Sequence, residues 1–408
     1  MEYPKRTRIL FSELRSKNNV LETFNAIRNS EKCLSESHEE CLRNWAEYCE
    51  KLYCGYNIKP TRFLPVENKK LDGPITFDEF KTAIQSLKNN KAPGNDFITN
   101  EDIKQFLLQE SVDLDSFEFS DVVLNILFNL MVGFWEYERI PSGLKKVILR
   151  PSFLKNKDKD EYAPENYRTI SLLNTLFKLY EAIIHNRLVC YLEKELLLSP
   201  VQAGYRPKKS TVDHILVLQE LFLEYRFNKI GKRGGRNKKA LYLCFLDLVK
   251  AFDKVSREYL FRKLYQIGIS GKMLRVIQDM YTGNKATVLV DNCLTREFEI
   301  HSGVLQGSKL GPLLFLVFIN DMLTDLQKSG LGAKMGNLSI SCLGFADDVV
   351  LTAETPANLQ LLIDKCECWA KKNLMEFNIS KCKIMIFNRP ELYLKFSIYQ
   401  KELSVVNR

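Results

Sequence analysis

The sequence is poor in histidine, its cysteines have no regular spacing, and it contains no long uninterrupted hydrophobic run. Only four histidines occur among 408 residues. The 11 cysteines are odd in number and irregularly placed, which favours reduced thiols over a disulfide framework. Cys366 and Cys368 form a close pair, but no CxxC or Cys/His cluster completes a ligand set. These absences argue against a structural zinc site and against a disulfide-rich secreted domain.

The hydrophobic stretches are too short to cross a lipid bilayer. The longest are residues 313–319 and the interrupted run 122–135, whereas a membrane-spanning helix needs about 20 apolar residues. The N-terminus carries Lys5, Arg6 and Arg8 with no apolar segment behind them, which is not the pattern of a secretory signal. We therefore expect an intracellular protein with no membrane partner.

The composition is that of an ordinary folded protein. Hydrophobic residues make up 45% of the chain and charged residues 27%. The length is enough for about two or three compact units with a sizeable core. The formal net charge of +9 permits a polyanionic partner such as nucleic acid but does not require one.

The first half of the chain is expected to be mostly helical. Apolar residues have near-helical spacing within residues 1–70, and Thr76 followed by Glu79 is a capping box that predicts a helix through about Leu87. Residues 91–96 have the chemistry of a turn. Helices are then predicted at 122–135, 174–192 and 211–227, and a strand at 146–154. The glycine-rich basic segment 229–239 is consistent with a solvated loop or with a phosphate-contacting loop.

The second half has a mixed pattern of helices and strands. A buried strand is predicted at 241–246, a helix at 256–267, and two strands at 286–290 and 298–301 around a turn at Asp291 and Asn292. An apolar helix follows at 312–326. The runs 338–343 and 349–352 then flank an acidic pair. This order predicts a strand, a helix, and a hairpin with carboxylates at its tip.

Three aspartates lie where an ionised carboxylate is costly. Asp247 follows the apolar run 241–246, and Asp347 and Asp348 stand between the apolar runs 343–346 and 349–351. A charge in such surroundings needs a cation partner, and no basic residue lies within several positions of the pair. Oxygen ligands without histidine favour Mg²⁺. An Asp-Asp pair also suits a simple β-turn, but Asp247 in its own strand favours a shared two-metal site for nucleotidyl transfer. Without metal, repulsion should raise at least one carboxyl pKa.

A series of segments resembles the motifs of reverse transcriptases of the non-LTR retrotransposon type, over nearly the whole chain. Residues 246–253 resemble motif A, residues 303–315 motif B, Phe-Ala-Asp-Asp at 345–348 motif C, and residues 378–383 motif D. Upstream, residues 166–173 and 202–206 resemble the finger motifs. Residues 91–96 resemble the segment before the fingers in Jockey-like and chicken-repeat-like elements.

The resemblance implies roles for the matching residues. Asp247, Asp347 and Asp348 would bind two Mg²⁺ ions and carry catalysis, with Lys381 as general acid toward pyrophosphate. Phe252 would be the steric gate that excludes a 2′-hydroxyl, or else a core aromatic. The other implied nucleotide-binding residues are Lys155, Arg168, Gln306 and Gly307, the glycine allowing close approach of backbone to substrate. The candidates for contact with template and primer are Arg206, Lys208, Lys209 and the loop 229–239.

Some of these assignments leave alternatives open. Lys155 and Lys381 could equally be solvated lysines, and Lys157 or Lys383 could take either place. Asp253 matches a family position outside the metal set and is expected to cap the following helix. Thr169 stands where the family usually has Pro, and Leu144 where it usually has Trp; both are tolerable packing changes.

The implied fold is α+β: the fingers and palm of a right-hand polymerase, with an antiparallel palm sheet backed by helices. We expect a helical extension over residues 1–70, fingers over 71–240, and a palm with the active site over 241–390. Residues 391–408 would begin the primer-grip region, with no thumb after it.

The implied function is RNA-directed DNA synthesis, with an RNA template, a DNA primer and dNTPs as partners and, from the family, the nucleus as location. The alternative is a catalytically incomplete retrotransposon remnant that only binds RNA or a protein partner. The missing thumb favours the alternative, and the intact carboxylates and gate favour the enzyme. An RNA-dependent RNA polymerase shares the carboxylates but needs a small or polar residue where Phe252 stands.

Overall fold

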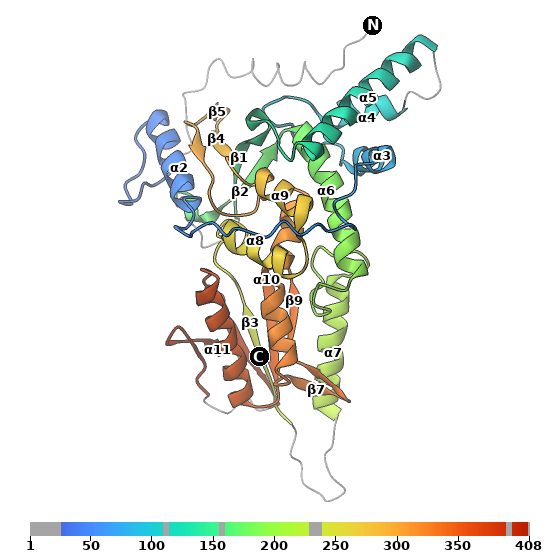
Figure 1. Cartoon of the computed structure of the whole chain (residues 1–408). Coiled ribbons are helices and arrows are strands. Elements are labelled where there is room, and N and C mark those ends of the chain that lie inside the picture. Colours follow the sequence, from blue (N-terminus) through green and yellow to red (C-terminus); the bar gives the residue numbers. More distant parts are fainter. Residues whose placement is uncertain (1–25, 109–113, 155–159, 228–238, 389–393, 407–408) are drawn as a thin grey trace, which may run out of the picture.

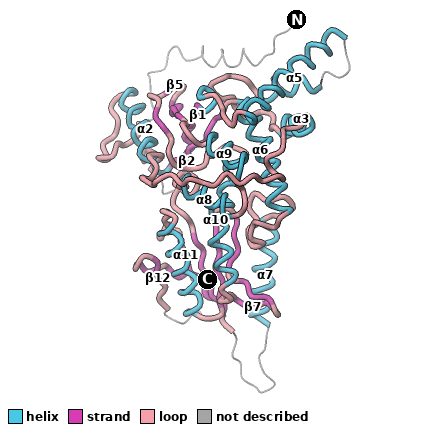
Figure 2. The backbone as a smooth tube through the Cα atoms, viewed as in Figure 1, coloured by secondary structure: helices cyan, strands magenta, loops and turns pink. Residues whose placement is uncertain are grey.

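The structure is a computed structural model that describes residues 26–108, 114–154, 160–227, 239–388 and 394–406. It is elongated, with two β-sheets placed one beyond the other and helices packed against each (Figure 1). The tube view in Figure 2 shows the strands gathered in these two regions. The helices are α2 (His38–Leu52), α3 (Phe77–Ser86), α4 (Asn100–Leu108), α5 (Leu114–Glu136), α6 (Thr175–Lys194), α7 (Thr211–Phe227), α8 (Arg257–Gln266), α9 (Gly271–Met280), α10 (Leu310–Lys328) and α11 (Pro356–Lys372), with short 3₁₀ turns at Ser142–Lys145 and Pro164–Asn166.

The first sheet has the strand order β2-β1-β4-β5, with β6 also paired to β4. Strand β1 (Lys146–Phe153) runs antiparallel to β2 (Tyr167–Leu173) and parallel to β4 (Lys285–Val290). The short strands β5 (Cys293–Leu294) and β6 (Phe298–Glu299) complete it. This sheet corresponds to the predicted fingers, but β4 to β6 come from residues expected in the palm. The chain therefore leaves the first sheet at β3 and returns to it through the parallel β1–β4 pairing, so the two regions are not each built from one continuous stretch of sequence.

The second sheet has the strand order β14-β11-β3-β10-β9. Its strands β3 (Leu241–Leu246), β9 (Cys342–Phe345), β10 (Asp348–Ala353) and β11 (Lys383–Phe387) pair antiparallel, and β14 (Ser404–Val405) adds to β11. Two hairpins lie beside it, β7 (Ala333–Met335) with β8 (Leu338–Ile340) and β12 (Ser397–Ile398) with β13 (Lys401–Glu402). The antiparallel palm sheet and the α+β class predicted from the sequence are confirmed.

Strand β3 is buried on both faces, as its continuous apolar run predicts. Tyr242 and Cys244 join the large core that contains α10 and α11. Leu241 and Leu243 join a second cluster with Leu221 of α7. Helix α7, predicted as part of the fingers, thus packs on the palm. Because side chains of a strand alternate between faces, this single strand holds both helix layers to the sheet.

Helix α10 is long and apolar enough to cross a membrane by length and composition. Two thirds of its apolar window is buried inside the protein, and Phe315, Phe318 and Ile319 are fully enclosed. We interpret it as the central core helix of the palm, on which the second sheet is built.

The N-terminal region is helical only in part. Ser37 caps α2 by accepting a hydrogen bond from the Glu40 amide, but residues 54–72, here called the strap, form neither helix nor strand. Of the helical extension expected over residues 1–70, the described residues contain only α2, and residues 1–25 lie outside them. The strap crosses the molecule between the two sheets (Figure 1). Tyr56 donates to the carbonyl of Leu374 at 3.1 Å, so the strap ties the N-terminal region to the palm.

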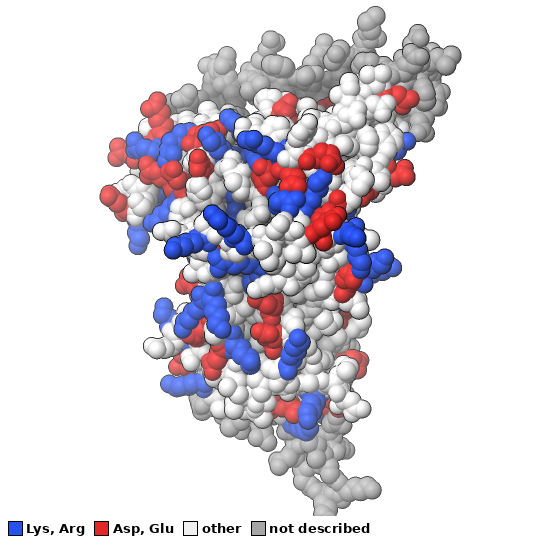
Figure 3. All heavy atoms as spheres, viewed as in Figure 1, with Lys and Arg blue, Asp and Glu red and all other residues white. Residues whose placement is uncertain are grey.

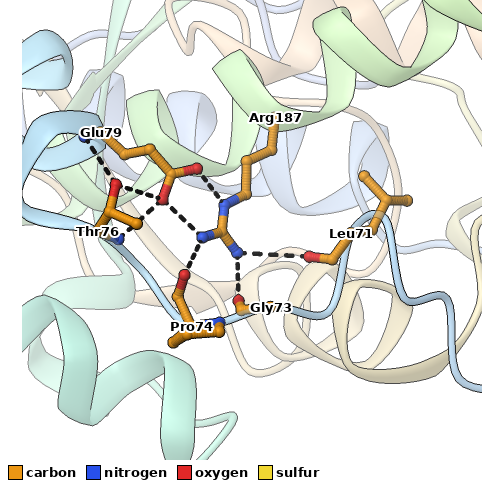
Figure 4. A network of polar contacts seen from close by, with 6 residues as sticks. All are labelled: Leu71, Gly73, Pro74, Thr76, Glu79 and Arg187. Atoms are coloured by element: carbon orange, nitrogen blue, oxygen red, sulfur yellow. Dashed lines mark hydrogen bonds and ion pairs between the residues drawn. The ribbon is translucent and has the colours of Figure 1, made fainter.

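The capping box predicted at Thr76 and Glu79 is present and opens α3. Its glutamate has a second function, because the Arg187 guanidinium from α6 pairs with both carboxylate oxygens at 2.6 Å (Figure 4). The same guanidinium donates to the carbonyls of Gly73 and Pro74. One arginine thus fixes the strap's end, the start of α3 and the long helix α6 to one another.

Candidate active site

The three aspartates meet at one end of the second sheet. Strands β3 and β10 pair antiparallel with Leu246 opposite Val349. The next positions outward are Asp247 and Asp348, which therefore lie side by side. Asp347 belongs to the two-residue connection between β9 and β10, since Phe345 pairs directly with Asp348. The hairpin with carboxylates at its tip, predicted from the sequence, is present.

The connection at the tip has an unusual backbone. Ala346 has a φ of +55°, a left-handed conformation that costs a residue with a Cβ atom about 1 kcal/mol or more. The side-chain amide of Gln202, which is 1% exposed, contacts both backbone polar groups of this residue. Sequence reasoning did not assign Gln202 a role, although it opens the finger motif 202–206.

Lys381 joins the carboxylates from the turn that precedes β11. Residues 376–378 run beside the segment after β3, with the Val249 amide bonded to the Glu376 carbonyl and the Asn378 amide to the Asp247 carbonyl. This places the Lys381 Nζ atom 3.0 Å and 3.2 Å from the two carboxylate oxygens of Asp247. The structure thus brings together all four residues predicted to carry the chemistry.

The electrostatics of the cluster are those of crowded carboxylates. Burial raises the pKa of Asp347, and the charges of Asp348 and Asp247 raise it further. Burial also raises the pKa of Asp348, with the charge of Asp247 acting in the same direction and Lys381 opposing both. The repulsion expected from the sequence is confirmed. Each of these carboxylates is more costly to ionise than in water, so a cation at this point would be bound favourably.

The donor set suits a hard divalent cation, because it consists of carboxylate oxygens whose charges repel one another. Among the residues that the structure describes, no three His, Cys, Asp or Glu side chains lie in an arrangement that would by itself hold a metal ion. Asp247, Asp347 and Asp348 are therefore near one another without forming a complete ligand set in this structure.

Phe252 lies five residues after Asp247, in the turn that follows β3, and is partly buried. Its ring stacks on Phe315 of α10, with centroids 4.7 Å apart and planes inclined by 20°. Tyr205 meets it edge-on at 6.4 Å. The ring therefore has a rigid support behind it. The contact is compatible with both hypotheses for Phe252, a steric gate or a core aromatic, because a gate also needs a ring that is held in place.

Comparison with known proteins decides the family. The profile described as "Reverse transcriptase (RNA-dependent DNA polymerase)" matches residues 154–403, well over half of the chain. The chain belongs to the reverse transcriptase family. The resemblance noted in the sequence motifs is confirmed, and reverse transcriptases in general use divalent metal ions.

The curated relatives are polymerases of non-LTR retrotransposons. The RNA-directed DNA polymerase from the mobile element jockey of Drosophila funebris is 30% identical over 322 residues, which cover 77% of this chain and 32% of that protein. Its Drosophila melanogaster counterpart is 24% identical over 377 residues, covering 89% and 38%. The Pol polyprotein of the type-2 retrotransposable element R2DM is 30% identical over 219 residues, covering 54% and 19%. The chain thus spans 19% to 38% of the length of these relatives.

A solved structure of apo telomerase from Candida tropicalis superposes with a TM-score of 0.44 and 12% identity, covering 87% of this chain and 84% of that one. At this level the likeness carries no argument. The family assignment rests on the sequence profile and the relatives.

In this reverse transcriptase, the first sheet brings Arg168 of β2 toward the carboxylates. Arg168 is exposed, and its charge partly opposes the rise that burial causes in the pKa of Asp347. Gln306 is held to the same strand, because its carbonyl accepts a hydrogen bond from the Ser171 amide at 2.6 Å. Arg168 and Gln306 therefore lie on the fingers side of the carboxylate cluster.

Gly307 has a structural reason to be glycine. Its φ is +119°, and a Cβ atom there would lie 2.5 Å from the carbonyl oxygen of Ser171. Its backbone therefore approaches strand β2 of the fingers more closely than a side chain would allow. The residue joins the motif B loop to the fingers, whatever its relation to a nucleotide.

The predicted template contacts divide into two groups. Arg206 is 8% exposed, and its guanidinium pairs with both oxygens of Glu193 at 2.8 Å while donating to the carbonyl of Ser199. The prediction that Arg206 binds template is wrong, because a buried, fully paired guanidinium has no reach to a phosphate. Lys209 donates to the carbonyl of Pro200 at 2.7 Å, whereas Lys208 is exposed.

Two other predicted contacts, Lys155 and nearly all of the basic loop 229–239, lie outside the described residues. On the face seen in Figure 3, basic and acidic side chains are intermixed. The excess of positive charge therefore does not form a single basic surface on that side of the molecule.

Asp253 was expected to cap α8, and this is wrong. Ser256 caps that helix by accepting from the Tyr259 amide. The Asp253 carboxylate, 2% exposed, instead accepts a hydrogen bond from the Tyr53 hydroxyl at 2.8 Å. Tyr53 also lies 2.6 Å from the hydroxyl of Thr169 in β2. Burial raises the pKa of Asp253 to about 6. This network joins the N-terminal region, the fingers and the loop after the gate.

Proposed function

We propose that this chain forms the polymerase core of a non-LTR retrotransposon protein and extends a DNA primer on an RNA template by two-Mg²⁺ nucleotidyl transfer. One observation carries the proposal. Strand pairing sets Asp247 beside Asp348 at the sheet end, with Asp347 on the adjoining tip and Lys381 on Asp247. The chain spans only part of the length of its relatives, so the RNA template, the DNA primer and the dNTPs are themselves part of this proposal.

The three aspartates and Lys381 would carry the nucleotidyl transfer. Asp247, Asp347 and Asp348 would hold the metal. Burial raises the pKa of Asp347 and of Asp348, and the charge of Asp247 raises both further, so a divalent cation at this point would relieve the repulsion. Two Mg²⁺ ions, when bound, supply a lowered pKa for the primer 3′-hydroxyl and neutralisation of the triphosphate charge. Lys381, which pairs with Asp247 in this structure, would donate a proton from its ammonium to the departing pyrophosphate.

The remaining residues would select and hold the nucleotide. Phe252, backed by Phe315, would meet a ribose 2′-hydroxyl with a ring that cannot retreat, which selects dNTPs over rNTPs. Arg168 would pair with the triphosphate from the fingers side, because a guanidinium binds phosphate oxygens bidentately. Gln306 and Gly307 would border the same pocket, and Lys155 is kept as a further triphosphate contact.

The template would be RNA, read through its backbone rather than its bases, as suits a hybrid recognised by shape. Lys208 is the exposed candidate for a phosphate contact. Lys209 would serve only after releasing the Pro200 carbonyl. The family implies that the copying of RNA into cDNA takes place in the nucleus.

The deciding experiment is primer extension on poly(rA)·oligo(dT) with dTTP and Mg²⁺. The double variant Asp347→Asn, Asp348→Asn should abolish synthesis, while Asp364→Asn, an exposed acid on α11, should leave it unchanged. Loss in both variants would contradict the assignment of the carboxylates. A folded wild-type chain that binds poly(rA) but extends no primer would overturn the proposed function in favour of an incomplete copy that only binds RNA.

A further inference from the structure

The orientation of Asp347 and Asp348 depends on a hairpin tip whose backbone is in an unfavourable conformation. The connection between β9 and β10 has only Ala346 and Asp347 in it, and Ala346 is left-handed with a φ of +55°. Glycine would adopt this conformation without cost, whereas alanine adopts it only where surrounding contacts impose it. A contact from outside the hairpin that binds the backbone of Ala346 would therefore stabilise the tip in addition to the pairing of its strands.

Gln202 makes this contact. Its Oε1 atom accepts from the Ala346 amide at 2.9 Å, and its Nε2 atom donates to the Ala346 carbonyl at 3.2 Å. Oε1 also accepts from the Gly204 amide at 2.9 Å. Because two backbone N–H groups face one end of the side-chain amide and a carbonyl faces the other, the amide has one satisfactory orientation. Both polar groups of the strained residue are thus bound by one buried side chain.

Gln202 is itself held in place from both sides. The backbone around it extends the palm sheet, with the Gly344 amide bonded to the Val201 carbonyl and the Ala203 amide to the Gly344 carbonyl, each at 2.9 Å. The Arg206 guanidinium donates to the Gln202 carbonyl at 3.2 Å. This explains why Arg206 is buried: it anchors the segment that grips the hairpin.

Gly204 completes the contact. A Cβ atom at this residue would lie 2.4 Å from the amide nitrogen of Ala346. A side chain here would push the tip away from Gln202, so the segment 202–206 fits the hairpin only with glycine at its centre. The finger motif therefore has a mechanical connection to the carboxylates of the palm.

We propose that Gln202 is a positioning residue that directs Asp347 and Asp348 toward Asp247, and thereby sets the affinity of the three carboxylates for a divalent cation. The inference rests on the proposed function, because it takes these carboxylates as the metal ligands. It adds that a residue of the finger motif aligns these carboxylates, although Gln202 and Ala346 are 144 residues apart in the sequence. Groups that orient metal ligands typically change metal affinity by about 10- to 100-fold when removed.

The test compares Gln202→Met with Gln327→Met. Gln327 of α10 makes the same kind of two-pronged contact near the opposite end of β9, donating to the Ser339 carbonyl at 2.6 Å and accepting from the Ser341 amide at 3.2 Å. Each variant loses a side-chain amide that bridges backbone groups, so each should lower the thermal unfolding temperature. Only Gln202 touches the metal-binding tip.

The main readout is Mn²⁺ binding, followed by the electron paramagnetic resonance signal of the free ion, on the folded chain without nucleotide. Gln202→Met should raise the Mn²⁺ dissociation constant by about tenfold or more, and Gln327→Met should leave it within about twofold of wild type. Unchanged Mn²⁺ binding in folded Gln202→Met, or an equal change in both variants, would overturn the proposal.

A second variant keeps the test valid where Gln202→Met does not fold. Gly204→Ala retains the amide and displaces the tip by a single methyl group, so it should also weaken Mn²⁺ binding. Unaltered binding in that variant counts against the role. The Mn²⁺ measurement does not depend on DNA synthesis. A wild-type chain that binds Mn²⁺ but extends no primer would therefore contradict the proposed function and leave the role of Gln202 to be decided by the variants. A wild-type chain with the same Mn²⁺ binding as Asp347→Asn, Asp348→Asn defeats both.

Discussion

Lys381 and Asp247 lie 134 residues apart in the sequence and form an ion pair, with Nζ 3.0 Å from Oδ2. The lysine side chain is 56% exposed, and an ion pair so open to water adds little to the stability of the fold. Lys383, which could have taken its place by sequence, donates instead to the Ser404 hydroxyl at 2.8 Å. The structure thus distinguishes two lysines that the sequence left equivalent.

Lys381→Met should slow nucleotide incorporation by about 100- to 10,000-fold, the range expected for loss of a general acid. The ammonium donor to pyrophosphate is removed, and the pKa of Asp348 loses the neighbour that lowers it. Lys383→Met is the matched control and should retain near wild-type rates. Single-turnover extension by one nucleotide measures both. A rate for Lys381→Met close to that of its control would exclude the acid role.

Phe252→Ala should reduce the preference for dTTP over UTP by about tenfold or more. A tenfold loss corresponds to about 1.4 kcal/mol of discrimination between the two nucleotides. The smaller side chain leaves room for a 2′-hydroxyl. The measurement is the ratio of kcat/KM for the two nucleotides. Phe315→Leu, which changes only the support behind the ring, should alter this ratio less. An unchanged ratio in Phe252→Ala would make the ring a core aromatic only.

Asp253→Asn should flatten the pH dependence of stability. The carboxyl pKa is raised from 3.8 to about 6 in the fold, so the folded state holds the proton more tightly than the unfolded chain. Stability is therefore lost as pH rises from about 4 to about 6, by up to roughly 3 kcal/mol. Asparagine keeps an acceptor for Tyr53 and cannot ionise.

Urea unfolding at a series of pH values measures this effect. The control is Glu354→Gln, where a carboxylate that is 25% exposed accepts from the Tyr225 hydroxyl at 2.7 Å. That variant should keep the slope between pH 4 and 6. If Asp253→Asn keeps the slope as well, another group is responsible.

Arg187→Met should destabilise the chain by about 3 kcal/mol, because it leaves Glu79 and the carbonyls of the strap's end without their donor. The arginine side chain is 11% exposed, and the Glu79 side chain 33%. The control is Lys70→Met, which removes an exposed pair with Glu195 and should change stability little. Chemical denaturation of both variants provides the comparison, and equal effects would show that the network does not organise the strap.

Local structure followed closely from the sequence where short-range chemistry decides it. The helix predicted at 211–227 is α7 (Thr211–Phe227), the capping box at Thr76 opens α3, and the apolar run 241–246 is β3. The acidic hairpin was also foreseeable, because two apolar runs around an Asp pair leave few other arrangements. Nothing local predicted that β4 would pair with β1, since that contact joins segments more than 100 residues apart (Lys146 with Lys285).

At the site, the sequence does not show which charged side chains are buried and paired with distant residues. Arg206 and Lys208 have the same sign and neighbouring positions, and composition cannot tell which of them is enclosed by Glu193. Asp253 could not be recognised as the partner of Tyr53, which lies 200 residues before it. Gln202 has a neutral side chain, and nothing in the sequence around it indicates a contact with the hairpin tip. Its importance comes from the left-handed Ala346 that it holds.

The sequence by itself determined the family, the α+β class and the three aspartates, because motif order, hydrophobic periodicity and costly charges are properties of neighbouring residues. Only the tertiary structure decided which lysine meets Asp247, which arginine is buried, and what holds the hairpin tip. Those outcomes depend on contacts between segments far apart in the chain, whose free energy is realised only when the two sheets and their helices have packed together.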